Sequence, residues 1–157
     1  MAVSAGLFLD TSVFVAGLIE MGEASAASRN LLEAIATGRV TGVQTAWHCC
    51  LEFYSVATRL PAGLRVTPDL ANRLLTENII ERMKIVDLPA AARGTFFSTV
   101  VQDKVAGGRV YDAHIAEVAR LAGARVVVTG NRRDFLGLLR HAIRVISPEE
   151  FADQFGL

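Results

Sequence analysis

The sequence predicts an α/β domain in which two layers of helices enclose a central, mainly parallel five-stranded sheet, a three-layer α/β/α sandwich. Short apolar runs alternate along the chain with longer segments of helical period, a pattern typical of layered α/β folds. Residues 125–129 are the clearest strand, and Phe8 and Leu9 belong to a short apolar run that looks buried on both faces, as a central parallel strand is. With 157 residues, 52% of them hydrophobic, the chain can bury one sizeable core. We therefore expect a single domain over residues 1–157, without a linker or an internal repeat.

Charge and cysteine content narrow the functional classes. Lys plus Arg and Asp plus Glu number 16 each, which argues against a general polyanion-binding surface and restricts any nucleic-acid contact to a local patch. Cys49 and Cys50 are neighbours on a predicted helix and point apart, so a mutual disulfide is disfavoured and a reducing compartment fits. No Lys or Arg precedes Asp10, and the apolar run at residues 13–19 is too short to span a bilayer. We expect a cytoplasmic protein without a signal peptide and without membrane contact.

Residues 7–14 are the stretch around which the prediction is built. A short apolar strand runs directly into Asp10, and Thr11 and Ser12 can accept hydrogen bonds from the free N–H groups that open the following helix. A carboxylate at the end of a buried strand is costly unless it is paired or bound to a metal. In open α/β sheets this carboxyl edge is where ligands bind. The alternative is that Asp10 is a solvated turn residue or a helix cap.

Turn and capping residues divide the rest of the chain into elements. Gly38 ends a helix whose apolar face includes Leu31 and Ile35, and Thr67 followed by proline and an acid opens another. Ser147 begins a capping box that opens the last helix. The expected strands cover residues 7–9, 40–44, 84–88, 125–129 and 143–146. The expected helices cover residues 24–37, 46–59, 67–82, 90–105, 110–123 and 136–139 and a last segment from 148, with a loop over 130–135.

Acidic residues occur where this alternation would bring them to one edge of the sheet. Right-handed crossovers place every strand-to-helix turn of a parallel sheet on the same side. Asp10 ends the first strand, Glu52 lies in the helix after the second, Asp112 begins a helix, and Asp134 with Asn131 follows the strand at 125–129. Several carboxylates on apolar elements repel one another, and a divalent cation such as Mg²⁺ resolves that repulsion. A water held by such a cation can attack a phosphodiester.

Other catalytic devices are missing from the sequence. It contains neither a Gly-rich phosphate loop nor a Gly-x-Ser-x-Gly elbow. His48, His114 and His141 are separated along the chain, and we expect them to be structural. The acids are therefore the leading candidates for chemistry.

Four segments carry a resemblance to a known family. They are Leu9-Asp10-Thr11-Ser12-Val13, Leu51-Glu52-Phe53-Tyr54-Ser55-Val56, Arg109-Val110-Tyr111-Asp112-Ala113-His114-Ile115-Ala116 and Val128-Thr129-Gly130-Asn131-Arg132-Arg133-Asp134-Phe135. In this order, over nearly the whole chain, the segments resemble the PIN-domain ribonucleases, and among them the VapC-like toxins of type II toxin–antitoxin pairs. The resemblance implies a PIN-like fold and cleavage of RNA.

The resemblance also implies roles for individual residues. Asp10, Glu52 and Asp112 would hold Mg²⁺ or Mn²⁺, and Asp134 would be the fourth catalytic acid. Many members carry an acid where this chain has Asn131, so the number of metal ions stays open. Thr11 or Ser12, together with Thr129 and Asn131, would orient the carboxylates.

A structural explanation exists for each acid. Asp112 would be a helix N-cap, Glu52 would pair with Arg59, or Asp134 would cap the helix near Phe135. Two rival functions also remain. One is a phosphatase similar to the haloacid dehalogenases, although Ser12 stands where that family needs an acid. The other is a catalytically impaired PIN-like module that binds RNA or protein, which the substitution at Asn131 keeps open.

Partners follow from the same sequence features. Arg109, Arg132 and Arg133 are candidate phosphate contacts near the acids, and their alternative is a solvated surface. The resemblance implies a cognate antitoxin and a homodimer. Residues 13–19 and 46–59 are the apolar segments that we expect to be exposed for such contacts.

Overall fold

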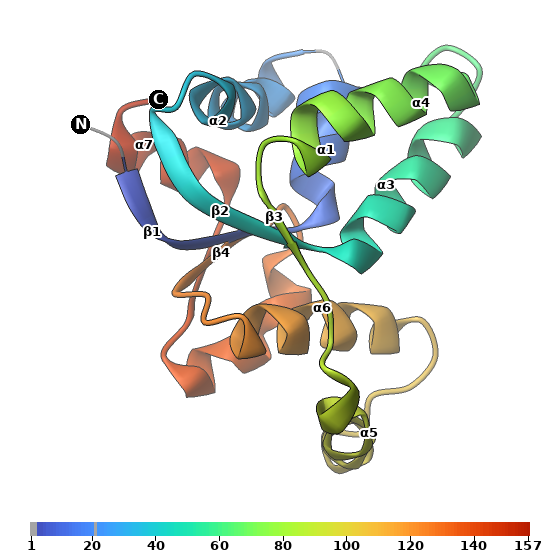
Figure 1. Ribbon diagram of the computed structural model, residues 1–157, viewed down its shortest axis with the longest axis vertical. Helices are drawn as coiled ribbons and strands as arrows, with labels where there is room; N and C mark the ends of the chain where they lie inside the picture. The colour runs from blue at the N-terminus through green and yellow to red at the C-terminus, as the bar shows by residue number, and fades with distance from the viewer. Residues whose placement is uncertain (1–2, 21) are drawn as a thin grey trace.

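The computed structural model describes residues 3–20 and 22–157 (Figure 1). In this part of the chain the strands form one five-stranded sheet in the order β3-β2-β1-β4-β5, and every neighbouring pair is parallel. The strands are β1 (Val3–Leu9), β2 (Val40–Ala46), β3 (Lys84–Val86), β4 (Val126–Val128) and β5 (Arg144–Ile146). The predicted α/β class with a parallel sheet is confirmed.

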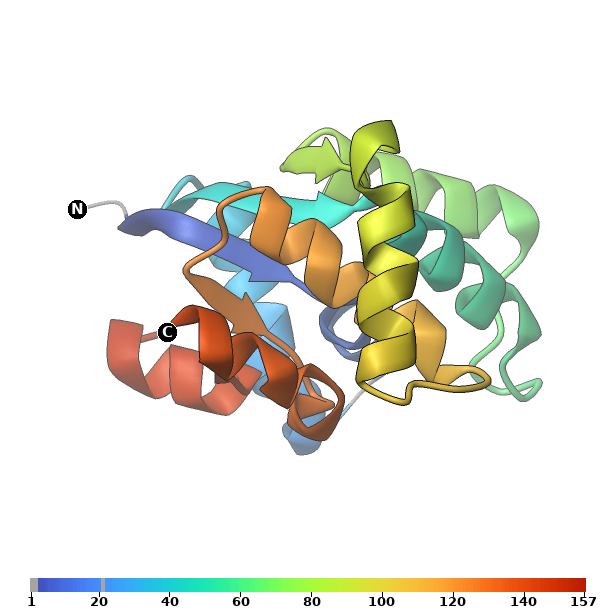
Figure 2. The same ribbon diagram turned by 90° about the horizontal axis from the view of Figure 1, so that it is seen from below.

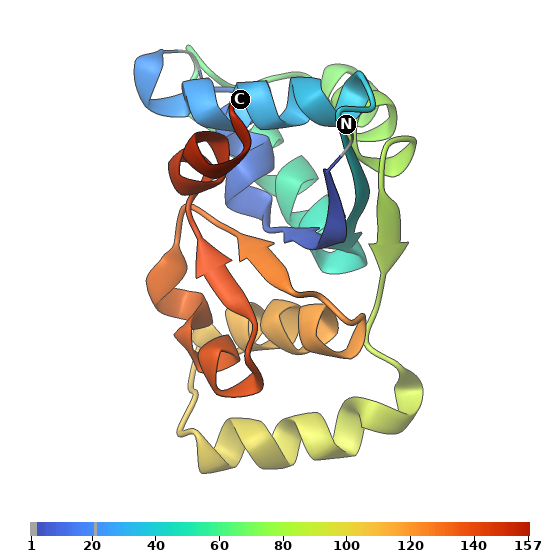
Figure 3. The same cartoon turned by 90° about the vertical axis from the view of Figure 1, so that its left-hand side faces the viewer.

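Helices cover both faces of the sheet, as Figure 3 shows. One layer contains α1 (Thr11–Leu18), α2 (Ala26–Ala36), α3 (Trp47–Arg59), α4 (Pro68–Leu75) and α7 (Pro148–Phe155). The opposite layer contains α6 (Arg109–Leu121) and the 3₁₀ segment η4 (Arg132–His141), with α5 (Arg93–Gln102) lying outermost across α6 (Figure 2). Shorter turns are η1 (Glu23–Ser25), η2 (Thr76–Ile80) and η3 (Ala90–Ala92). None of the helices in residues 3–20 and 22–157 has the length and hydropathy that a bilayer span requires.

Two helix starts follow the predicted capping chemistry. The Thr67 hydroxyl accepts a hydrogen bond from Leu70 N at 3.2 Å. Ser147 and Glu150 form the reciprocal capping box, with Glu150 N to Ser147 Oγ at 3.1 Å and Ser147 N to Glu150 Oε2 at 2.9 Å. These local signals place the entrances of α4 and α7 correctly.

Other boundaries differ from the sequence prediction. The expected loop over 130–135 is wrong from residue 132 onward, because η4 runs without a break from Arg132. Phe135 and Leu138 are both buried, and their spacing of three places them on one side of a helix with three residues per turn. The helix expected over 67–82 continues past α4 as the π-helical η2, and the one expected over 90–105 begins as η3 before α5.

The core lies on both faces of β1. Phe8 and Leu9 have no exposed surface, and Thr45 donates a hydrogen bond from its buried hydroxyl to Leu9 O at 2.8 Å. The segment at residues 13–19 also belongs to this core, since Val13 and Phe14 are fully buried. The expectation that this segment is exposed is therefore wrong.

Close packing of α1 against α2 generates a stability prediction. A Cβ on Gly17 would lie 2.5 Å from Leu32 Cδ1 and 3.1 Å from Ser28 O, whereas a Cβ on Gly94 in α5 would meet nothing within 4 Å. Because the end of the Leu32 side chain can move aside and the Ser28 backbone cannot, we expect Gly17→Ala to lower the free energy of unfolding by about 1 kcal/mol, the lower end of the usual cost of overpacking. Gly94→Ala is the matched control and should be neutral or slightly stabilising. Urea denaturation of both variants measures the difference; equal midpoints would contradict the close contact.

Candidate active site at the carboxyl edge of the sheet

The strand order reverses between β1 and β4, which makes their carboxyl ends a switch point of the sheet. The chain moves outward from β1 to β3 on one side of the sheet and then crosses to β4 and β5 on the other. In open α/β sheets such a switch point is where ligands bind. Asp10 follows β1 at this point and Thr129 follows β4, with Asp10 N donating to Val128 O at 3.1 Å. The first turn of α6 reaches the same edge, because α6 ends just before β4 begins.

Asp10 is both a helix cap and a buried carboxylate. It is 3% exposed and caps α1, accepting at Oδ2 from Ser12 N at 3.4 Å. The same oxygen accepts from Ser12 Oγ at 2.8 Å and from Thr129 Oγ1 at 2.9 Å. Burial raises the pKa of Asp10, and the two hydroxyl hydrogen bonds oppose that rise. Because these bonds all end on Oδ2, the other carboxylate oxygen is the natural one to offer to a ligand.

The two hydroxyls also hold the loop after β4. Gly130 N donates to Ser12 Oγ at 2.9 Å, and Asn131 N donates to Thr129 Oγ1 at 2.9 Å. Ser12 rather than Thr11 therefore reaches the carboxylate. The buried Thr11 hydroxyl makes no hydrogen bond to the described residues and lies beside Cys49 instead. Asn131 takes part through its backbone, and its side chain is exposed.

The pKa of Asp112 is affected by the other three predicted acids. Its pKa is raised to about 6, first by burial and then by the negative charges of Asp134, Asp10 and Glu52, in that order. The four carboxylates are therefore near enough to one another for their charges to interact. The carboxylates are nonetheless loosely spaced: among the described residues, no three His, Cys, Asp or Glu side chains lie close enough to form a ready metal cage.

Glu52 pairs with a histidine that sequence reasoning did not assign to the site. His48 Nε2 lies 3.4 Å from Glu52 Oε2, one turn earlier on α3, so the alternative pairing with Arg59 does not form. His48 also lies 5.5 Å, centroid to centroid, from both Tyr111 and His114. His48 and His114 are therefore in contact although they are separated along the chain. The spacing of four between His48 and Glu52 on a predicted helix was the available signal.

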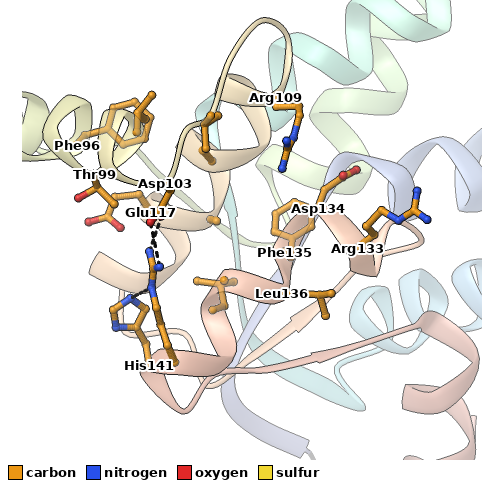
Figure 4. A pocket seen from close by; sticks show the side chains of 17 residues that line it. Phe96, Thr99, Asp103, Arg109, Glu117, Arg133, Asp134, Phe135, Leu136 and His141 are labelled. Carbon is orange, nitrogen blue, oxygen red and sulfur yellow. Dashed lines mark hydrogen bonds and ion pairs between the residues drawn. The ribbon is translucent and has the colours of Figure 1, made fainter.

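Asp134 opens onto a cleft of about 420 Å³ between α5, α6 and η4. Figure 4 shows Asp134 near Arg109 and Arg133 at one end of this cleft. Arg132 does not line the cleft. It forms an ion pair with Glu150, with its guanidinium 3.0 Å from Glu150 Oε1. Of the three arginines predicted to contact phosphate, two therefore line the cleft and one is held in a surface ion pair.

Comparison with known proteins gives this arrangement a family. The PIN domain family matches residues 6–133, most of the chain. The chain belongs to the PIN domain family. It is similar to Ribonuclease VapC40 of Mycobacterium tuberculosis, with 31% identity over 118 residues that cover 75% of this chain and 81% of that protein. It is also similar to Ribonuclease VapC27 of the same species, with 34% identity over 113 residues covering 72% and 76%.

Solved structures support the PIN fold independently. A chain of FitAcB from Neisseria gonorrhoeae matches with a TM-score of 0.59 and 17% identity, covering 91% of this chain and 98% of that one. A chain in the structure of FitAB bound to an IR36 DNA fragment matches with a TM-score of 0.58 and 17% identity, covering 90% and 94%. At this identity the likeness establishes the fold alone. The PIN-like architecture predicted from the sequence is confirmed.

The raised pKa of Asp112 predicts a specific pH dependence of stability. Because this pKa, about 6, lies above the unfolded value, the folded metal-free protein holds the extra proton between about pH 4 and 6. The contribution of Asp112 to the free energy of unfolding therefore falls as the pH rises through that window. Asp112→Asn should be more stable than the parent by about 1–2 kcal/mol at pH 7.5 after allowance for solvent screening, and by almost nothing at pH 4.

Thermal denaturation in EDTA at both pH values measures this effect. Asp103 is the matched control, because its hydrogen bond to Arg140 lowers its pKa. Asp103→Asn should not stabilise the protein at pH 7.5. Equal stabilisation by both substitutions, or none by Asp112→Asn, would contradict the charge repulsion described here.

Proposed function

We propose that this protein is a metal-dependent endoribonuclease that hydrolyses RNA phosphodiester bonds, and that it acts as the toxin of a toxin–antitoxin pair. The observation that carries the proposal is the raised pKa of Asp112 at the switch point of the sheet, caused first by burial and then by the charges of Asp134, Asp10 and Glu52. Relatives that are 31% and 34% identical over 75% and 72% of this chain are named Ribonuclease VapC40 and Ribonuclease VapC27. The combination of an acidic edge with this family membership favours a nuclease over the phosphatase considered from the sequence.

The donor set fits a hard divalent cation. Asp10, Glu52, Asp112 and Asp134 offer only carboxylate oxygens, which Mg²⁺ and Mn²⁺ prefer. Mg²⁺ is commonly held by one or two carboxylates and retains several waters, so widely spaced acids suit it better than a closed cage would. When bound, the ion would supply an activated water and neutralise charge on the phosphate.

The chain's own residues have distinct tasks in this proposal. The hydroxyls of Ser12 and Thr129 fix the orientation of the Asp10 carboxylate. Asp112, with its pKa of about 6, must lose its proton before it can act as a ligand, so cleavage should increase from pH 5 to 7. Arg109 and Arg133 line the cleft and would bind phosphates there.

A cognate antitoxin and a second copy of the chain are the proposed protein partners. On α3, the exposed apolar side chains Trp47, Leu51 and Tyr54 recur at one- and two-turn spacing, which supports this helix as a contact surface. Val13 and Phe14 are unsuitable because they are buried.

Removing single acids tests the enzyme directly. Asp10→Asn and Asp112→Asn should each lower RNA cleavage in Mg²⁺ or Mn²⁺ by about 100-fold or more, because even the loss of a residue that only orients a ligand costs about 10–100-fold. Asp153→Asn, an exposed acid on α7, is the matched control and should cleave normally. Circular dichroism checks that all three variants fold. Cleavage at the parent rate by either site variant would refute the assignment.

A catalytically impaired module is the second candidate, favoured only by Asn131 at a position where the resemblance expects an acid. Calorimetry with Mn²⁺ separates it from the enzyme. The impaired module should bind Mn²⁺ weakly or not at all, and its affinity should not depend on Asp10.

Binding of RNA at different salt concentrations tests the arginines. In an Asp10→Asn background, which prevents cleavage, Arg133→Ala should reduce the slope of log Kd against log salt concentration by about 1, because one phosphate contact is lost. Arg132→Ala should change the slope less, since Arg132 pairs with Glu150. The reverse ranking would mean that the RNA passes on the η4 side that faces α7.

A further inference from the structure

A second recess lies beside the acids, away from the cleft. It is a shallow hollow of about 280 Å³ lined by His48, Leu51, Glu52, Ser55 and Tyr111. Its walls come from α3 and from the first turn of α6. Apart from Glu52, none of these residues has a role in the proposed hydrolysis.

An aromatic stack is the main feature of this hollow. The rings of His48 and Tyr111 are nearly parallel, with centroids 5.5 Å apart and an interplanar angle of 13°. His114 meets the His48 ring edge-on at 81°, and Phe96 meets His114 edge-on at 78°. The stack is therefore supported from behind by α5 and α6. Its outer member, Tyr111, is 56% exposed, so a large apolar ring is held rigidly at the surface.

The acids lie between the hollow and the cleft. Glu52 lines the hollow, Asp134 lines the cleft, and both act on the charge of Asp112. Asp112 directly follows Tyr111 on α6. An RNA strand that runs from the cleft to the hollow therefore passes the carboxylates. Arg109 and Arg133 lie on the cleft side of that path, and the Tyr111 ring lies on the hollow side.

We propose that the hollow takes one unpaired nucleobase of the RNA, stacked on Tyr111, next to the phosphodiester that is cut. This inference rests on the proposed ribonuclease function and adds a site for one base of the substrate. A base within a duplex has both faces covered and cannot reach an aromatic ring, whereas an unpaired base can be splayed out and stacked. His48 is a positioning residue, because it holds the Tyr111 ring while its own Nε2 faces Glu52.

Base-by-base deletion in the substrate tests the stack. The probe is a set of single-stranded oligoribonucleotides in which an abasic residue replaces each nucleotide around the cleavage site in turn. The parent protein should lose about 10-fold or more in kcat/KM at one position next to the cut, as expected for one stacked base. Tyr111→Ala should show a similar loss on the intact strand and no further loss from the abasic residue at that position. Tyr111→Phe should behave like the parent, because the ring is kept.

A matched control removes an aromatic ring elsewhere on the surface. Phe155 on α7 is 38% exposed, packs on Phe151 and does not line the hollow. Phe155→Ala should retain both the parent activity and the full abasic penalty. If Tyr111→Ala still shows that full penalty, or cleaves the intact strand like the parent, the base does not stack on Tyr111. Equal cleavage of a duplex and a single strand by the parent would also overturn the proposal.

Failure of the proposed function gives a different pattern. If the parent protein does not cleave RNA in Mg²⁺ or Mn²⁺, the enzyme assignment fails. The same oligonucleotides then test the stack by fluorescence anisotropy without cleavage. Binding that weakens about 10-fold with Tyr111→Ala, and only for strands that retain the critical base, supports the nucleobase site; equal binding by both proteins overturns it.

Discussion

The carboxylate of Asp10 and the two hydroxyls that hold it fix the geometry of the whole carboxyl edge. Thr129 reaches Asp10 Oδ2 at 2.9 Å across 119 positions of sequence, and Ser12 reaches it at 2.8 Å. A buried carboxylate is unfavourable unless its oxygens accept such bonds. The same hydroxyls accept from Gly130 N and Asn131 N, so the loop that leads to Asp134 is positioned by the same contacts. These hydrogen bonds therefore link the ends of β1 and β4, the two strands between which the strand order reverses.

Like charges gather at this edge at the expense of stability. Burial and three neighbouring carboxylates raise the pKa of Asp112 to about 6, so the folded protein resists the state in which all four are ionised. Repulsion of this kind is common at functional sites. It persists because the packing around the site is stable enough to hold the like charges together. Here the surroundings are rigid: Phe8, Leu9, Val13 and Phe14, which flank Asp10, have no exposed surface. Burial of this core therefore stabilises the fold enough to offset the repulsion between the carboxylates.

Local signals predicted most of the fold, and long-range contacts account for the misses. The strand at residues 125–129 and the capping box at Ser147 depend on neighbouring residues, so the sequence suffices to place them. His48 and Tyr111 stack across 63 positions, and no periodicity reports such a pair. Arg132 and Arg133 are equivalent in sequence, yet successive residues of a 3₁₀ helix point about 120° apart. The sequence prediction placed both residues in a loop. Because they instead begin the 3₁₀ segment η4, their positions around its axis decide that Arg133, and not Arg132, lines the cleft.

Asn131 shows how the loop can change its charge without changing its geometry. The backbone N–H of residue 131 holds the Thr129 hydroxyl at 2.9 Å, and any residue other than proline can supply that donor. The side chain is exposed and is not needed for the contact. An acid there would add a negative charge to the loop that carries Asp134, whose charge already raises the pKa of Asp112. With an amide at 131, the edge has fewer like charges to neutralise than it would have with an acid there.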